Sequence, residues 1–242
     1  MFNFNYSTDA VSFGVDALAW VLIGLAAIRL YKRQQVKPKV WKIAVVIMAG
    51  LISFSIHWEL AGNLLKIPIL PLGVWILYGI LRGKEDRWDN YRSFAWLGFA
   101  GNFIFLAAAM VSILLYPVVY PESNASTYIA DAGNASIVDI HPSGKEGMIL
   151  DKDRLVDQLS SMKQEKVESD VWYEQMHHSS DGYRNRNERF PYQMVGVSSK
   201  WGSGADPVMY VEVDGKGILV STSHNQYYYR FSESILKEGA AR

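Results

Sequence analysis

The chain contains no cysteine. This absence excludes disulfide bonds, cysteine-ligated zinc, iron–sulfur clusters, thiol nucleophiles and lipidation of an N-terminal cysteine. An excess of charge of either sign is also missing, because 24 Lys and Arg residues balance 24 Asp and Glu residues. A neutral total provides no concentrated basic surface, so we expect no nucleic-acid partner.

The first half of the chain also lacks the motifs that chemistry inside a membrane requires. Residues 1–117 hold one histidine, His57, whereas bis-histidine haem ligation and an HExxH zinc site each need two. No GxxxxGK[ST] phosphate loop occurs. We therefore expect no cofactor, no metal and no catalytic residue, and we favour a protein that is not an enzyme.

The balanced charge hides two different halves. Residues 1–117 carry eleven Lys or Arg and six Asp or Glu, and long apolar runs separate the charge clusters. Residues 118–242 carry thirteen basic and eighteen acidic residues, and their composition is typical of a soluble domain. Such asymmetry indicates two compartments.

The apolar runs predict an all-α membrane bundle of about four transmembrane helices. A helix needs about 20 residues to cross a hydrocarbon core of about 30 Å. The third run, residues 66–81, is short and begins with Pro68 and Pro71, which suit the first turn of a helix. A re-entrant hairpin over residues 43–82 is the alternative. The four expected spans are residues 10–31, 43–60, 66–81 and 94–116.

Basic residues predict the orientation of this bundle. The segments 32–42 and 82–92 hold nine Lys and Arg residues, and the N-terminal tail before the first span holds none. Basic loops remain in the cytoplasm by the positive-inside rule. With four spans, we therefore expect a multi-pass protein of the cell membrane whose N- and C-termini are both extracytoplasmic.

Four ionisable side chains are expected in one layer of the membrane, about 6 to 9 Å below its outer boundary at 1.5 Å per helical residue. Charges at such depth are costly unless they are paired or hydrated, so a membrane polar cluster is one hypothesis. Alternatively these groups extend into the headgroups, or only hold the helices together. The four residues are Asp16, His57, Glu59 and Lys66.

Small and amide side chains in the last apolar run predict helix packing. Gly98 and Gly101 would let a neighbouring helix approach closely, and Asn102 would hydrogen-bond across to it.

The second half predicts a tether over 118–147, ending in a strand near 136–140, and an extracytoplasmic α+β domain over 148–242. A helix should start after Asp151, which suits an N-cap. The turn "DGKG" predicts an antiparallel β-hairpin over 207–223, and "NQYYYRF" adds a strand. A short closing helix is expected between Ser232 and Gly239.

Tyr227, Tyr228 and Tyr229, with Trp201 and Tyr210, form either an aromatic binding face or, for half or more of them, core.

One loop of this domain carries side chains suited to a ligand or partner. If the segment were helical, Glu174 and His178 would share a face and could bind a metal, together with His141 or His224. In a strand, adjacent histidines point to opposite faces, so a solvated loop is favoured. The candidate residues are His177, His178, Asp181, Arg184, Arg186 and Arg189.

Weak site chemistry and a substantial exported domain together predict a non-catalytic accessory or sensory subunit. Its partners would be the lipid bilayer and another membrane or envelope protein, contacted by the extracytoplasmic domain, in a layout typical of bacteria. The alternative is a small transport or ion-coupled component that uses the membrane polar cluster. A third hypothesis is an exported ligand-binding or hydrolytic domain centred on His177, His178 and Asp181.

Overall fold

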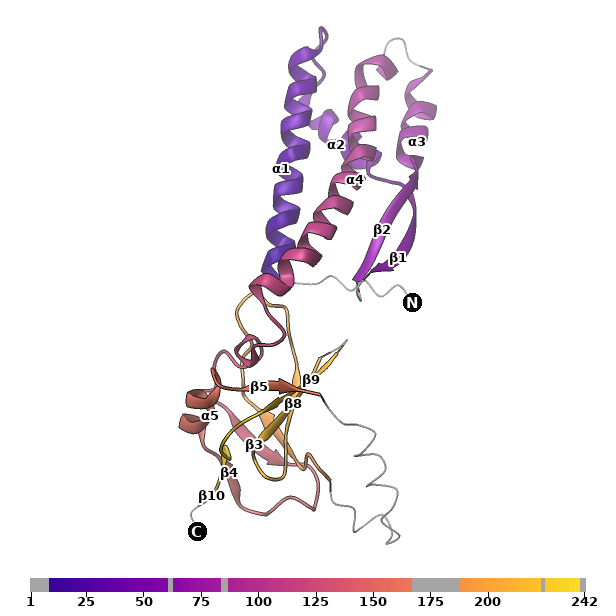
Figure 1. The fold of residues 1–242 in the computed structure, drawn as a ribbon. Helices are drawn as coiled ribbons and strands as arrows, with labels where there is room; N and C mark the ends of the chain where they lie inside the picture. Colours follow the sequence, from indigo (N-terminus) through magenta and orange to yellow (C-terminus); the bar gives the residue numbers. More distant parts are fainter. Residues whose placement is uncertain (1–8, 61–62, 84–86, 167–187, 223–224, 240–242) are drawn as a thin grey trace, which may run out of the picture. The chain divides into compact units, whose positions relative to one another are not determined.

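The computed structural model describes residues 9–60, 63–83, 87–166, 188–222 and 225–239. The chain divides into two compact units, which we call unit 1 (Met1–Tyr116) and unit 2 (Pro117–Arg242). Helices dominate unit 1 and an antiparallel sheet dominates unit 2 (Figure 1).

Two helices of the described chain are long and apolar enough to cross a membrane: α1, Ala10–Arg33, and α4, Arg87–Val119. Asp9 caps the start of α1, where its Oδ1 accepts a hydrogen bond from the Ser12 amide at 2.7 Å. Large apolar side chains along both helices are exposed, among them Phe13 and Leu114. Apolar side chains on the outside are what a helix in lipid presents, and the opposite of a helix in a soluble core.

The segment between these helices does not confirm the prediction of a four-helix bundle. Helix α2, Val40–Gly50, ends well before residue 60, and helix α3, Leu72–Leu81, starts after residue 66. Strands β1, Phe54–Leu60, and β2, Asn63–Leu70, form an antiparallel hairpin between them (Figure 1). Four spanning helices are therefore not confirmed.

The alternation of apolar and polar residues explains why a strand forms where a helix is expected. Phe54, Ile56 and Trp58 alternate with polar residues in β1, and this period of two fits a pleated strand. In β2, Pro68 lacks an N–H group, which suits the strand of a two-stranded sheet, where one edge stays unpaired.

The helices of unit 1 pack through glycines and one amide, as the sequence predicts for α4. A Cβ atom on Gly98 would lie 2.3 Å from the carbonyl oxygen of Ile47 in α2. Asn102 Nδ2 donates to the carbonyl oxygen of Leu51, at the end of α2, over 3.2 Å. Both expectations about this contact are confirmed, and the backbones of α2 and α4 therefore touch directly.

Unit 2 is built on a six-stranded antiparallel sheet with the order β3-β6-β7-β8-β9-β5. The predicted hairpin is present as β7 and β8, joined in the register Val208↔Ser221 to Val211↔Ile218. The strands are β3, Ser136–Asp139; β5, Lys163–Glu165; β6, Tyr192–Val195; β7, Val208–Val211; β8, Gly217–Ser221; and β9, Gln226–Arg230.

The core of unit 2 includes residues that the composition assigns to a tether. Tyr128, Ile129 and Ala135 are buried in the same cluster as Ile218 and Tyr229. A 3-10 turn, Ala125–Thr127, starts this part, so residues 118–147 are folded into the domain. Alanine, serine and glycine are compatible with a close-packed core as well as with a linker, so composition alone does not distinguish the two.

Helix α5, Lys152–Gln158, starts where the sequence places it. The Asp151 side chain accepts a hydrogen bond from the Arg154 amide, as an N-cap does. Leu155 is fully buried in the core of unit 2, and Leu159 and Met162 pack against that core.

The predicted closing helix is wrong. Residues Leu236–Glu238 form strand β10, which pairs with β4, Met148–Leu150, in a second two-stranded sheet. An isolated helix of about eight residues is marginal in water, and pairing with β4 buries Ile235 and Leu236 instead.

Candidate functional site

The structure places three members of the predicted membrane polar cluster on one hairpin. His57 in β1 lies opposite Lys66 in β2, and Glu59 is two residues further along β1. Residues two apart on a strand share a face, so all three side chains project from the same face of the hairpin.

Asp16 lies on α1 and is half-buried. Among the described residues, no ion pair joins Asp16 or Glu59 to Lys66. A shared site that includes all four groups therefore stays a prediction.

Most of the predicted ligand loop lies outside the described residues: His177, His178, Asp181, Arg184 and Arg186. Arg189 is described, and it is engaged rather than free. Its Nε donates to Glu212 Oε1 over 2.7 Å, and its Nη2 donates to the Tyr228 hydroxyl over 3.1 Å. The guanidinium group also lies over the Phe190 and Tyr228 rings.

Arg189 belongs to a compact ionic centre that we call the Glu212 cluster: Arg189, Glu212, Asp214, Tyr228 and Arg230. Glu212 is buried, and its Oε2 accepts hydrogen bonds from Tyr228 Oη at 2.6 Å and from Arg230 Nη1 at 2.7 Å. Arg230 Nη2 reaches Asp214 Oδ2 at 3.0 Å. The strand register brings these groups together. Gly217 lies opposite Arg230, and the Gly217 carbonyl oxygen accepts a hydrogen bond from the Glu212 amide.

The electrostatics of the Glu212 cluster are balanced internally. Two guanidinium groups face two carboxylates, and three donors occupy the Glu212 carboxylate. Burial and the neighbouring Glu212 charge raise the pKa of Tyr228, so its hydroxyl stays protonated and donates. A carboxylate saturated in this way is poorly placed to take up a proton or a ligand, so the cluster ties the segment before β6 and the end of β7 to β9.

Sequence reasoning missed Glu212 and Arg230, and it named Tyr228 only as an aromatic residue of the sheet. The available signal was the alternation in "VEVD" at the end of β7 and in "YYYR" of β9, which puts Glu212 with Asp214, and Tyr228 with Arg230, on one side of the chain. Gly217 leaves room for them, because a Cβ atom there would lie 2.1 Å from Glu212 Oε2 and 2.7 Å from Tyr228 Oη.

The three consecutive tyrosines of β9 are core rather than a binding face. Tyr227, Tyr228 and Tyr229 are all buried, and Tyr227 stacks on Tyr128 with ring centroids 5.4 Å apart. Burial raises the pKa of Tyr128, Tyr227 and Tyr229, with smaller contributions from neighbouring groups. Trp201 is different, because its side chain is exposed.

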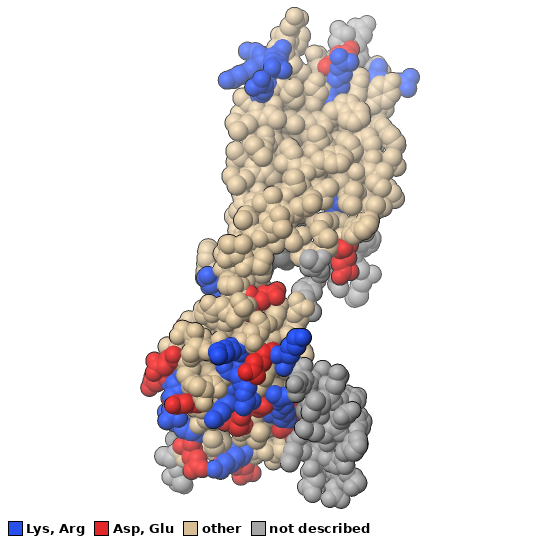
Figure 2. Space-filling model, viewed as in Figure 1, with Lys and Arg blue, Asp and Glu red and all other residues tan. Residues whose placement is uncertain are grey.

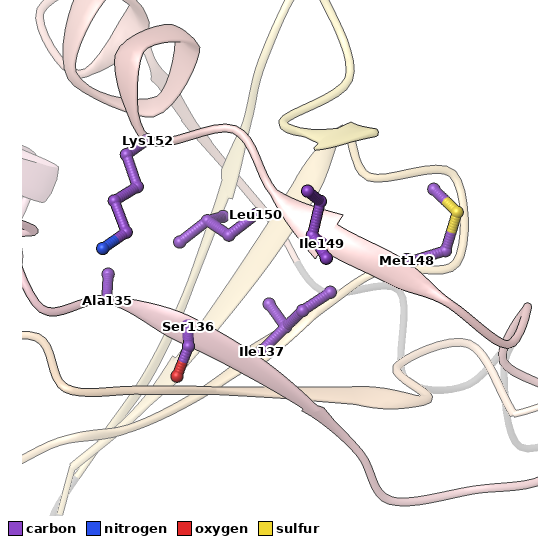
Figure 3. A pocket seen from close by; sticks show the side chains of 7 residues that line it. All are labelled: Ala135, Ser136, Ile137, Met148, Ile149, Leu150 and Lys152. Atoms are coloured by element: carbon purple, nitrogen blue, oxygen red, sulfur yellow. The ribbon is translucent and has the colours of Figure 1, made fainter. Parts of the chain in front are cut away.

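An open cleft of about 240 Å³ lies at one edge of unit 2, between β3 and β4 (Figure 3). Ile137, Ile149 and Met148 supply much of its lining, and Lys152 stands at one end. The Lys152 ammonium donates to the Gly133 carbonyl oxygen over 2.7 Å, so its charge is held at the rim. Apart from Ser136 and Lys152, the residues that line the cleft are apolar.

Within the described ranges, no group of three or more His, Asp or Glu side chains is arranged to hold a metal ion. His141 is described, and its Nδ1 hydrogen-bonds with Ser143 Oγ at 2.9 Å. Comparisons with models of protein families, with curated proteins and with solved structures found no match for this chain.

Proposed function

We propose that this chain is an integral membrane protein without catalytic activity, an accessory or sensory subunit whose unit 2 lies outside the cell membrane and contacts another envelope protein. The observation that carries the proposal is the apolar cleft beside β3. Strand β3 is the terminal strand of the sheet, and in the described part of the chain only β6 pairs with it. A terminal strand with an apolar cleft beside it is a place where proteins bind partners.

The surface of unit 1 supports the membrane placement. Lys and Arg side chains gather at one end of this unit, and a surface with few charged side chains follows (Figure 2). These basic residues include Lys32 and Arg33 in the last turn of α1, and Arg87 at the start of α4. The positive-inside rule assigns this end to the cytoplasm.

The same arrangement supports an even number of crossings. The α2–β1–β2–α3 segment starts after the basic end of α1 and finishes before the basic start of α4. It therefore enters and leaves on one side, whether or not it reaches the opposite surface. With α1 and α4 as spans, the chain crosses back to the outside before unit 2, and both termini are extracytoplasmic.

The first test is photo-crosslinking in the native cell. A photoreactive phenylalanine analogue replaces Ile149, which lines the cleft, and in a matched variant it replaces Val213, which has a similar exposure of 49% but does not line the cleft. We expect the probe at residue 149 to give a discrete crosslink to one envelope protein, identified by mass spectrometry. Identical products from both positions, or none from residue 149, would contradict the proposal.

A further inference from the structure

The end of α4 is fastened to a distant turn of unit 2. Residues 117–119, the last of α4, belong to unit 2 together with Lys200–Ser203, which we call the junction turn. Lys200 Nζ donates to the Val119 carbonyl oxygen over 3.0 Å, which caps a free carbonyl of the helix end. Tyr120 Oη donates to the Trp201 carbonyl oxygen over 3.1 Å, and the Lys200 ammonium lies over the Tyr120 ring.

The junction turn presents an indole that the fold of unit 2 does not use. Trp201 is 87% exposed, more than any other large apolar side chain of the described residues. Gly202 and Gly204 have positive φ angles of 74° and 65°, which side chains with a Cβ rarely adopt. Ser203 is buried, and its Oγ accepts the Ala205 amide. The backbone is thus fixed while the ring projects.

The length of α4 gives the level at which this ring would lie. From Ser93 to Val119 no residue is charged, a stretch of 27 residues. At 1.5 Å per residue this is about 40 Å, longer than the hydrocarbon core of about 30 Å and close to the 40–45 Å that includes both interfaces. If α4 crosses the bilayer, Val119 therefore emerges within the interfacial region, and the junction turn emerges with it.

We propose that the junction turn lies in the outer interface of the lipid bilayer, with the Trp201 ring among the headgroups and Lys200 near the lipid phosphates. Trp and Tyr concentrate at this level because their rings are amphipathic, and Lys adds attraction to phosphate. The Lys200 ammonium has three N–H groups, of which the Val119 carbonyl takes one. The inference rests on the membrane span of the proposed function, and not on the envelope partner.

Absence of native cysteine makes this proposal directly measurable. The full chain carries one cysteine, W201C, labelled with an environment-sensitive fluorophore and reconstituted into phosphatidylcholine vesicles. The vesicles contain lipids with a quencher either near the headgroup or deep in the acyl chain. Two further variants are labelled in the same way: V213C, at an exposed site of unit 2 outside the junction turn, and L114C, on the exposed apolar face of α4.

We expect the shallow quencher to reduce the fluorescence of the W201C label severalfold more than that of the V213C label, and both quenchers to reduce that of L114C. Equal quenching at 201 and 213, with L114C quenched, would overturn the junction-turn proposal and leave the span intact. No quenching at L114C would overturn the membrane placement itself.

Discussion

Replacing Glu212 by alanine is expected to lower the free energy of unfolding of unit 2 by about 3 kcal/mol, the lower end of the 3–5 kcal/mol typical of breaking a buried ion pair. The substitution removes the acceptor of three hydrogen bonds and leaves Arg189 and Arg230 facing each other without an intervening carboxylate. Both guanidinium groups stay about 30% exposed, and water partly compensates for the lost charge.

Hydrogen exchange of the detergent-solubilised full chain measures this effect. Amides of β8, such as those of Ile218 and Val220, report opening of the sheet beside the cluster. The matched control is Asp214→Asn, which removes only the more exposed pair with Arg230 and should cost less than about 1 kcal/mol. If Glu212→Ala destabilised β8 no more than Asp214→Asn, the cluster would not hold the strands as described.

Substituting Gly98 by alanine is expected to destabilise unit 1 by about 1–3 kcal/mol or more. The added Cβ atom would lie 2.3 Å from the Ile47 carbonyl oxygen and 2.8 Å from the Gly50 Cα. Both atoms are backbone, so α2 must move as a body to relieve the overlap, and the hydrogen bond from Asn102 to Leu51 would stretch with it.

The control is Gly79→Ala, which we expect to stabilise unit 1 rather than destabilise it. Gly79 in α3 has no atom within 4 Å of a built Cβ. Gly79→Ala therefore gains helix propensity worth up to about 1 kcal/mol without an overlap. Denaturant titrations followed by circular dichroism compare the two variants. Equal effects of the same sign would show that α2 and α4 are not in backbone contact.

Short-range sequence signals predict several elements of unit 2 correctly. Asp151 predicts the start of α5 because a cap acts through bonds within one turn, and "DGKG" predicts the β7–β8 hairpin for the same reason. The closing helix was wrong because β4, more than 80 residues away in sequence, offers pairing that the local pattern does not show. Burial of Tyr128 beside Tyr227 likewise depends on distant contacts.

In unit 1, hydrophobic length and hydrophobic period lead to different predictions for the segment after α2. The apolar average of residues 43–60 predicts a span, whereas the alternation of Ser55, His57 and Glu59 with larger apolar side chains predicts a strand. For the polar sites, the density of His and Arg residues in sequence predicts a ligand loop at residues 177–189. The Glu212 cluster is instead assembled by strand register from separate segments, which spacing alone does not reveal.

Cysteine labelling of sealed right-side-out membrane vesicles tests the central claim, that the chain crosses the membrane with unit 2 outside and the basic end of unit 1 inside. The cysteine-free chain carries either V213C in unit 2 or K37C in the basic connection after α1, both at exposed positions. A membrane-impermeant maleimide should label V213C at once and K37C only after the vesicles are opened. Labelling of both sites in sealed vesicles, or of K37C alone, would contradict the account.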